Sequence, residues 1–366
     1  MTIAFYAPLK SPDHPVPSGD RQMARLLMAA LSQAGYDPQP ASTLRSYLPE
    51  GDCGLEALQS AAGAEVERLL HAYRSGAAPA PELWFTYHPY YKSPDLIGPQ
   101  IADALKVPYV TAEATHANKR ANGPWAQAHA LNQRALERAD LNFYFTHRDK
   151  EGLVSLIGSE NKVCHLPPFL DVGAIPERTD WASTADGPVR LLTVAMMRQD
   201  VKLESYQMLA EALCGLDHLS WSLDIVGDGE ARPQVDQAFA SLPPERLTWH
   251  GRVTSDELAP LYGACELYVW PGFGEAYGMA FLEAQTAGLA VVAQETGGIS
   301  SVVRHGETGL LTPLGDVEAF RKNLSELMEN RARLSDFGQA ALTFVRSERS
   351  IETASERLKN ALDQLT

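Results

Sequence analysis

The residues best suited to chemistry are two glutamates, Glu275 and Glu283, which lie eight positions apart. Glu275 falls in a loop broken by Pro and Gly after an apolar strand expected at 267–270, and Glu283 falls inside a helix expected at 279–286. At ~1.5 Å rise per residue, the helical part of this gap is roughly 8 Å, so both carboxylates can border one crevice. Carboxylates only accept hydrogen bonds, so they suit hydroxyl-bearing ligands such as sugars and repel phosphates.

The start of the helix at 279 favours a different group. A helix N-terminus after a strand offers N–H groups and the positive end of the helix dipole, which suit a diphosphate. Gly272, Gly274 and Gly278 let the backbone come close to such a ligand. The plain alternative is that Glu275 is a surface loop residue and Glu283 a solvated helix residue.

The segment 270–293 and the residues after it resemble the retaining glycosyltransferases of family 4, which have the GT-B fold. Their signature is a loop-helix E-x7-E, followed after the next strand by a Gly-Gly turn, here at 295–298. The segments 301–306 and 309–311 also match in order. The resemblance covers nearly the whole chain, is strong from 190 to 316 and is weak before that. It implies an α/β protein with two Rossmann-like β/α/β domains facing each other across a cleft.

The resemblance implies roles for four charged residues. Glu275 would hold the hydroxyls of the sugar of a nucleoside diphosphate sugar donor, and Glu283 would hold the ribose of its nucleotide. Arg198 and Lys202 would bind the diphosphate. The family's Gly-Arg pair is absent here, since Arg198 comes one residue late and only four positions before Lys202. On a helix or turn this spacing still places both cations on one side. The alternative is an ordinary surface i,i+4 pair.

The resemblance also implies contacts to the donor from smaller residues and from backbone. Gly19 matches the glycine of the first loop that lets the backbone approach the phosphates, although Ser18 stands where many members have a second glycine. A plain helix-opening turn is the alternative for Gly19. The remaining donor-binding candidates are Arg252 and Val253, at the nucleotide base, and Phe273, Gly274, Ala276, Tyr277 and Gly278.

Polar side chains follow two of the strands expected in the first half. His88 and Tyr90 come at and after a strand at 83–88, and His116 follows a strand at 107–111. Ligands of open α/β sheets bind beyond the carboxyl ends of strands. In the resembled family, a histidine near the position of His116 faces the sugar donor and the acceptor. The resemblance therefore adds His116 to the catalytic candidates. His88 and Tyr90 are acceptor-side candidates. The alternative for each histidine is an ordinary hydrogen-bonded loop residue.

The chain order predicts two domains. Residues 1–170 form an N-terminal Rossmann-like acceptor domain, the turn-rich segment 171–188 is a linker, and residues 189–350 form the donor domain. The last helices are expected at 317–329 and 351–365, and the final helix region, 351–366, is expected to complete the first domain. A capping box at Ser255-Asp-Glu-Leu258 is expected to open a helix.

Composition limits the partners. The 366 residues are 45% hydrophobic and 21% charged, as in a globular protein. The net charge of −15 divides into −3 for residues 1–175 and −12 for the rest, which argues against nucleic acid and does not favour an anionic membrane surface. No segment has the ~18 consecutive apolar residues that span a bilayer. Four scattered cysteines indicate a reducing compartment, so we expect a cytoplasmic protein without stable membrane insertion.

These observations and the resemblance together predict a metal-independent hexosyltransferase without a cofactor. It would move a hexose from a nucleoside diphosphate sugar to an acceptor hydroxyl with retention, in glycan or glycoconjugate biosynthesis. A UDP-sugar is the expected donor and GDP-mannose the alternative. The acceptor is a glycan, a lipid-linked molecule or a small molecule. Alternatives are a GT-B epimerase or phosphorylase, a non-catalytic nucleotide-sugar binder, and hydrolysis by paired carboxylates.

Overall fold

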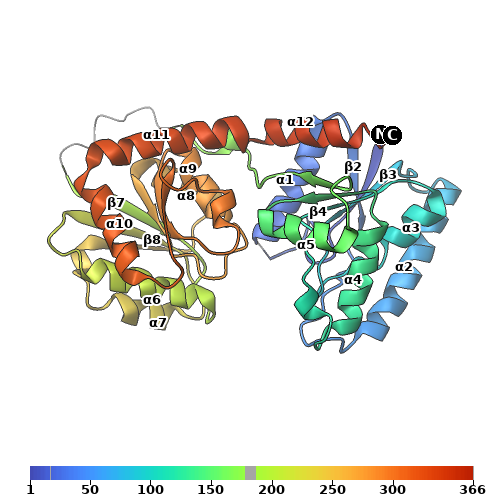
Figure 1. Cartoon of the computed structure of the whole chain (residues 1–366), viewed down its shortest axis with the longest axis horizontal. Helices are drawn as coiled ribbons and strands as arrows, with labels where there is room; N and C mark the ends of the chain where they lie inside the picture. Colours follow the sequence, from blue (N-terminus) through green and yellow to red (C-terminus); the bar gives the residue numbers. More distant parts are fainter. Residues whose placement is uncertain (17, 178–186, 366) are drawn as a thin grey trace. The chain divides into compact units, whose positions relative to one another are not determined.

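The computed structural model describes residues 1–16, 18–177 and 187–365, and the chain divides into two compact units (Figure 1). Unit 1 contains residues 1–167 and 351–366, and unit 2 contains residues 168–350. The linker predicted at 171–188 includes residues 178–186, which lie outside the described residues. The division at 167/168 comes three residues before the end of the predicted first domain.

Unit 1 is built on a six-stranded parallel sheet with the order β2-β1-β3-β4-β5-β6. Its strands are β1 (Thr2–Tyr6), β2 (Asp37–Ser42), β3 (Leu83–Tyr87), β4 (Tyr109–Ala112), β5 (Leu141–Tyr144) and β6 (Val163–His165). Its α-helices are α1 (Gly19–Gln33), α2 (Leu55–Ser75), α3 (Gly98–Leu105), α4 (Ala126–Arg138), α5 (His147–Ile157) and α12 (Ile351–Leu362). Strands β3 and β4 are buried throughout, as expected for a parallel sheet covered on both faces.

Unit 2 repeats this architecture with the strand order β12-β11-β10-β7-β8-β9, again all parallel. Its strands are β7 (Val189–Val194), β8 (Trp221–Val226), β9 (Leu247–Gly251), β10 (Leu267–Val269), β11 (Ala290–Gln294) and β12 (Gly309–Thr312). Its α-helices are α6 (Val201–Cys214), α7 (Arg232–Phe239), α8 (Ser255–Ala264), α9 (Met279–Thr286), α10 (Val317–Glu329) and α11 (Arg331–Glu348).

The strand orders place one switch point in each unit. In unit 1 the chain runs from β1 outward to β2 and then returns to β3 on the other side of β1. In unit 2 it runs from β7 through β8 to β9 and returns to β10 on the other side of β7. Loops that leave adjacent strands in opposite directions open a crevice at the carboxyl edge of the sheet, where ligands of such folds bind.

Several elements differ from the sequence-based expectations. Strand β2 and helix α11 were not anticipated: β2 has the sequence DPQPAS, whose two prolines are poor strand formers and fit only its place at the sheet edge. The capping box of α8 was assigned to the wrong residue. Thr254, not Ser255, accepts from the backbone of Glu257, whose carboxylate returns to the backbone N–H of Thr254.

Helix α12 belongs to unit 1, although it follows unit 2 in the chain. It packs on α1, and its buried face contains Ile351, Ala354, Leu358 and Leu362. At its far end the hydroxyl of Tyr36 donates to the carboxylate of Asp363 at 2.7 Å. In the described part of the chain, no helix is both long enough and apolar enough to cross a membrane.

Candidate functional site

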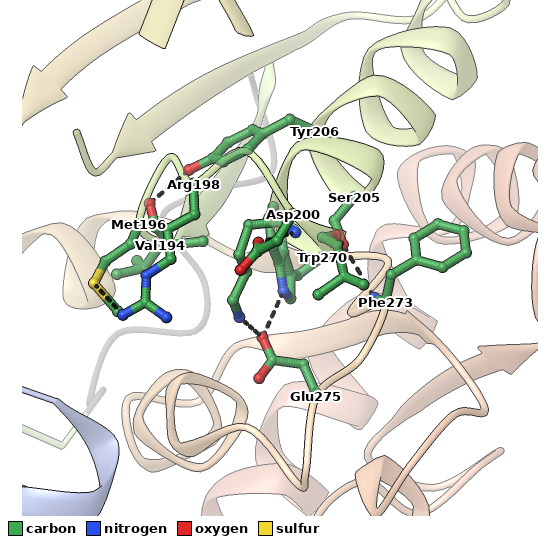
Figure 2. A network of polar contacts seen from close by, with 12 residues as sticks. Val194, Met196, Arg198, Asp200, Ser205, Tyr206, Trp270, Phe273 and Glu275 are labelled. Carbon is green, nitrogen blue, oxygen red and sulfur yellow. Dashed lines mark hydrogen bonds and ion pairs between the residues drawn. The ribbon is translucent and has the colours of Figure 1, made fainter. Parts of the chain in front are cut away.

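A lysine, a glutamate and a tryptophan form one polar network in unit 2 (Figure 2). The Nζ of Lys202 contacts Oε1 of Glu275, and the indole N–H of Trp270 donates to the same oxygen at 3.1 Å. The ammonium of Lys202 also lies 5.6 Å from the centre of the Trp270 ring. Lys202 and Glu275 are each 18% exposed, so the pair is partly shielded from water and stays accessible to a ligand.

The network sits at the switch point of unit 2. Lys202 is the second residue of α6, which follows β7, whereas Trp270 and Glu275 lie in the loop after β10. Strands β7 and β10 are neighbours in the sheet, so the fold brings together residues more than sixty positions apart. Figure 2 shows the same loop held to α6 by a second contact, in which the backbone N–H of Phe273 donates to Ser205 Oγ at 3.0 Å.

The glycine conformations fix the shape of this loop. Gly274 has a φ of +67°, and a Cβ on it would lie 2.7 Å from Val201 at the start of α6. Gly297, in the predicted Gly-Gly turn, has a φ of +58°, and a Cβ there would come within 1.9 Å of the carbonyl oxygen of Glu275. The turn at 295–298 therefore packs directly on the backbone of Glu275, and only glycine fits.

The N-terminus of α9 differs from those of its neighbours. Helices α6, α8 and α10 are capped by the side chains of Asp200, Thr254 and Asp316. Among the described residues, no side chain caps α9, whose N-cap is Gly278 with a φ of +80°. A Cβ on Gly278 would lie 2.6 Å from the ring of Phe281, so a capping side chain is sterically excluded. The backbone N–H of Phe281 donates to the carbonyl of Gly278 at 3.1 Å, and the N–H groups of the two residues before it are thereby kept for another acceptor.

The charges of both predicted carboxylates raise the pKa of one buried tyrosine, Tyr268. Burial, followed by the charges of Glu275 and Glu283, raises the pKa of Tyr268. Glu283 lies in α9 and accepts a hydrogen bond from the hydroxyl of Tyr262 at 2.9 Å. Tyr268 lies on β10, so both carboxylates are close enough to this strand to affect one of its side chains.

Arg198 departs from the predicted pairing. Helix α6 begins only at Val201, with Asp200 as its N-cap, so Arg198 precedes the helix and is not related to Lys202 by a helical turn. Its guanidinium is exposed and lies 3.4 Å from the sulfur of Met196 (Figure 2). The four-residue spacing between Arg198 and Lys202 is therefore not a spacing within a helix.

The glycines of the turn after β8 hold the segment that contains Arg198. A Cβ on Gly227 would lie 1.8 Å from the carbonyl oxygen of Ala195, and one on Gly229 would lie 2.2 Å from that of Met197. Both glycines have φ values near +150°, and the backbone N–H of Met197 donates to the backbone carbonyl of Asp228 at 3.0 Å. The Gly-rich exit of β8 thus serves close backbone packing.

The other donor-side candidates lie at the rim of unit 2. Arg252 is exposed and Val253 half-buried in the turn between β9 and α8. Within the described ranges, no hydrogen bond, ion pair or ring contact joins Arg252 to the Lys202–Glu275 pair. In the β10–α9 loop, Ala276 is exposed and Tyr277 is buried.

In unit 1 the predicted His88 belongs to a cluster of titratable groups. Its Nδ1 lies 3.1 Å from Oδ1 of Asp20, in the first turn of α1, and its ring stacks on Tyr90 at 5.1 Å. Burial would lower the pKa of His88, but the charge of Glu113 and the contact with Asp20 outweigh it and raise the pKa to about 9. Burial raises the pKa of Glu113 to about 7, and Glu113 also accepts from the hydroxyl of Tyr87 at 2.9 Å.

Two members of this cluster have strained backbone. His88 has a φ of +57° and Glu113 a φ of +53°, a region that residues with a Cβ seldom occupy. They follow the adjacent strands β3 and β4, at the carboxyl edge of the sheet. Sequence reasoning missed Asp20 and Glu113, whose only signal was a carboxylate placed directly after a glycine or a strand.

The remaining unit 1 candidates lie apart from this pairing. His116 Nε2 lies 2.9 Å from the side-chain oxygen of Asn118, and its ring centre is 5.0 Å from that of His129. Burial and then the charge of His116 lower the pKa of His129. Gly19 is the first residue of α1, and no described atom lies within 4 Å of where its Cβ would be, so nearby protein atoms do not require glycine there.

Comparison with known proteins gives a family match in unit 2 and a fold match over the whole chain. Residues 188–330 match the family model described as glycosyl transferases group 1. D-inositol 3-phosphate glycosyltransferase of Mycolicibacterium gilvum is 27% identical over 283 residues, which are 74% of this chain and 64% of that protein. The chain spans between 23% and 64% of the length of such curated relatives.

Two solved structures share the fold of the entire chain. Sucrose-phosphate synthase of Thermosynechococcus elongatus aligns with a TM-score of 0.74 and 20% identity, covering 100% of this chain and 98% of that one. Anabaena HepE, solved in complex with UDP, aligns with a TM-score of 0.74 and 13% identity, with both chains fully covered. Residues 188–330 are therefore similar to the group 1 glycosyltransferases, and the two six-stranded parallel sheets of the chain are those of the GT-B fold.

Proposed function

We propose that the protein is a retaining glycosyltransferase of family 4 that moves a hexose from a nucleoside diphosphate sugar to an acceptor hydroxyl. The bond from the anomeric carbon to the diphosphate oxygen breaks, and the acceptor oxygen bonds to that carbon on the same face. The acceptor proton passes to the departing phosphate. The acceptor is a glycan, a lipid-linked molecule or a small molecule, and the reaction takes place in the cytoplasm.

The observation that carries this proposal is the contact between Lys202 and Glu275 beside the uncapped N-terminus of α9. A cation and a helix N-terminus suit the negative charge that builds on the leaving diphosphate. Glu275, which only accepts hydrogen bonds when ionised, suits the hydroxyls of the sugar. One small site thus offers separate groups for the charged and the hydroxyl-bearing halves of the donor.

The proposed chemistry uses no metal ion. Lys202, the N–H groups at the start of α9 and, from the segment before α6, Arg198 supply the positive charge for the diphosphate. Glu283, held by Tyr262, is assigned to the ribose. We assign UDP as the nucleotide of the donor, with GDP as the alternative, and HepE, which shares the fold, was solved with UDP and with UDP-glucose.

The first test is calorimetric titration of the protein with UDP, GDP and ADP, without added metal. We expect one nucleotide to bind and its affinity to stay the same when magnesium is added. Binding of none of the three would contradict the proposal, and binding that requires magnesium would contradict its metal independence.

The second test separates transfer from binding. With the sugar derivative of whichever nucleotide binds, we expect Glu275→Gln to lower turnover by about 100-fold or more, because the sugar loses a charged acceptor. Glu204→Gln is the matched control, since Glu204 is an exposed carboxylate in the first turn of α6. Equal turnover of Glu275→Gln and Glu204→Gln would remove Glu275 from the site.

A non-catalytic nucleotide-sugar binder is the second candidate. It is favoured by the segment before α6, where the family's Gly-Arg pair is absent and Arg198 lies exposed on Met196. Tight nucleotide binding without transfer or hydrolysis of any donor sugar would establish this candidate.

A further inference from the structure

Unit 1 carries three cations that lie over aromatic rings, and we call them and their rings the cation–aromatic patch. The Nζ of Lys92 is 4.5 Å from the centre of the Trp125 ring and 5.9 Å from that of Tyr91. The guanidinium of Arg120 lies 4.8 Å from the Tyr91 ring. The third cation, Arg45, lies 4.7 Å from the ring of Tyr47.

Two rings of the patch, Tyr91 and Trp125, contact each other, and Tyr91 also contacts the neighbouring Tyr90. Tyr91 meets Trp125 edge-on at 5.6 Å and Tyr90 at 5.5 Å. Tyr90 in turn stacks on His88, so the patch continues into the His88–Asp20 pair. All these rings are half-buried, so each is fixed by packing on one side and accessible on the other.

The loops that carry the patch follow β2, β3 and β4, at the carboxyl edge of the sheet. Backbone and side-chain bonds join them. The backbone N–H of Leu48 donates to the carbonyl of Lys92 at 2.8 Å, and the indole of Trp125 donates to the carbonyl of Leu48 at 2.8 Å. The backbone N–H of Asp52 donates to the carbonyl of Pro124 at 2.6 Å. The patch is therefore held in place by the protein before any ligand arrives.

The cations of the patch have no carboxylate partner, in contrast to several other cations of unit 1. Carboxylates lie within 4.0 Å of the side-chain nitrogens of Arg25, Arg68, Arg138, Lys150 and Lys359. Within the described ranges, no carboxylate lies within that distance of Arg45, Lys92 or Arg120. In a chain of net charge −15, three cations gathered without a counter-charge mark a place for an anion from outside.

We propose that the cation–aromatic patch binds an acidic saccharide, a sugar ring that carries a carboxylate or a phosphate. Aromatic faces pack against the C–H face of a sugar ring, and the adjacent ammonium and guanidinium groups pair with its anionic group. Resting on the proposed function, this assigns the acceptor to the class of acidic saccharides. The His88–Asp20 pair next to Tyr90 lies within reach of its hydroxyls.

The competing explanation is that the cations only tie the loops together. Lys359 tests this, because its ammonium also lies over a tyrosine ring of unit 1, 5.7 Å from the centre of Tyr36, and pairs with Asp363. If the contacts serve stability alone, Lys92→Gln and Lys359→Gln lower the melting temperature alike and leave ligand binding unchanged.

The experiment compares three probes that share one sugar ring and differ only in the group at C6, the carbon outside the ring: glucose, glucuronate and glucose 6-phosphate. Binding to the full-length protein is measured by calorimetry or saturation-transfer NMR, with and without saturating UDP, which blocks the donor site. We expect at least one acidic probe to bind about 10-fold more tightly than glucose, with UDP present. Preference for glucuronate identifies a carboxylate and preference for glucose 6-phosphate identifies a phosphate as the recognised group.

The variants decide whether the patch is responsible. We expect Lys92→Gln with Arg120→Gln to reduce the preference for the acidic probe to less than about 2-fold, Lys92→Arg to retain it, and Lys359→Gln to leave it unchanged. Equal binding of all three sugars, absence of binding, or a preference that survives in the double variant would overturn the proposal. Failure of UDP to bind is a separate result, since it contradicts the proposed function and leaves the saccharide titration interpretable.

Discussion

At the scale of single residues, Trp270 connects the two charged groups of the candidate site. Its indole N–H donates to Glu275, its ring lies beneath the ammonium of Lys202, and the ring also packs edge-on against Tyr206 at 4.8 Å. Trp270 is 1% exposed, so it cannot move without disturbing the core. Its structural role is to hold the carboxylate and the cation at fixed positions.

We therefore expect Trp270→Phe, which keeps a ring beneath Lys202 and removes the N–H, to lower kcat by about 10-fold with a smaller change in KM. The reason is that loss of one hydrogen bond to a charged group costs about 1.5–3 kcal/mol. Trp221→Phe is the matched control: Trp221 is equally buried, donates to the carbonyl of Leu216 and lies beneath Arg246 outside the network. Equal kcat values for the two variants would contradict the role of Trp270.

The His88 cluster makes the stability of unit 1 depend on pH. The pKa of His88 rises from 6.5 to about 9 and that of Glu113 from 4.5 to about 7, so both groups hold protons more tightly when folded. A raised pKa contributes stability that is present at low pH and lost as the pH rises through the folded value. We expect the free energy of unfolding of unit 1 to fall from about pH 4.5 to about pH 7 as Glu113 loses its proton, and from about pH 6.5 to about pH 9 as His88 does, the His88 part by up to about 3 kcal/mol.

Urea denaturation at several pH values, followed by hydrogen exchange in β3 and β4, measures this slope. His88→Gln removes the titrating ring, so the slope above pH 7 is expected to flatten. His71→Gln, at an exposed histidine of α2, serves as the control and is expected to retain it. A slope unchanged by His88→Gln would show that other groups cause the dependence.

At the scale of elements, the shape of the site depends on turns that only glycine can make. Gly297 combines a φ of +58° with a Cβ position 1.9 Å from the carbonyl oxygen of Glu275. We expect Gly297→Ala to destabilise unit 2 by about 2–4 kcal/mol, because both the backbone conformation and the contact are violated. Thermal or urea unfolding of unit 2 measures the loss.

Gly263, inside α8, provides the comparison. Its φ is not positive, and its Cβ position has no described atom within 4 Å. Gly263→Ala is therefore expected to stabilise α8 by about 0.5–1 kcal/mol. A similar destabilisation by both alanines would show that the close contact at Gly297 is relieved by movement of the loop.

The sequence was most informative where the residues of the candidate site follow one another closely in the chain. The loop and helix with Glu275 and Glu283 were predictable because strand, glycines and helix follow one another in the chain. The partners Ser205 and Tyr262 were not, because their hydrogen bonds to this region depend on the pairing of strands and packing of helices. Arg198 was misplaced because four-residue spacing is informative only inside a helix, and α6 begins after it.

At the scale of the whole molecule, two units each carry a complete sheet and their own core, and α12 completes the first of them. Leu358 is fully buried in α12, whereas Asn360 on the same helix is exposed. We expect Leu358→Ala to destabilise unit 1 by about 2–4 kcal/mol and Asn360→Ala to have little effect.

Because two units need not unfold together, hydrogen exchange resolved along the chain is the suitable measurement. In Leu358→Ala, faster exchange is expected in α1 and β1 and unchanged exchange in β7 and β10. Faster exchange in β7 and β10 to the same degree would show that the units unfold as one cooperative body.

The position of α12 has a consequence for folding while the protein is being synthesised on the ribosome. Unit 2 is one continuous stretch, and it is synthesised between α1 and α12. Unit 1 waits, because the helix that covers α1 follows unit 2 in the chain. During translation, the apolar face of α1 that later packs on Leu358 and Leu362 is therefore exposed while unit 2 is synthesised, a window in which chaperones can bind and nascent chains can aggregate.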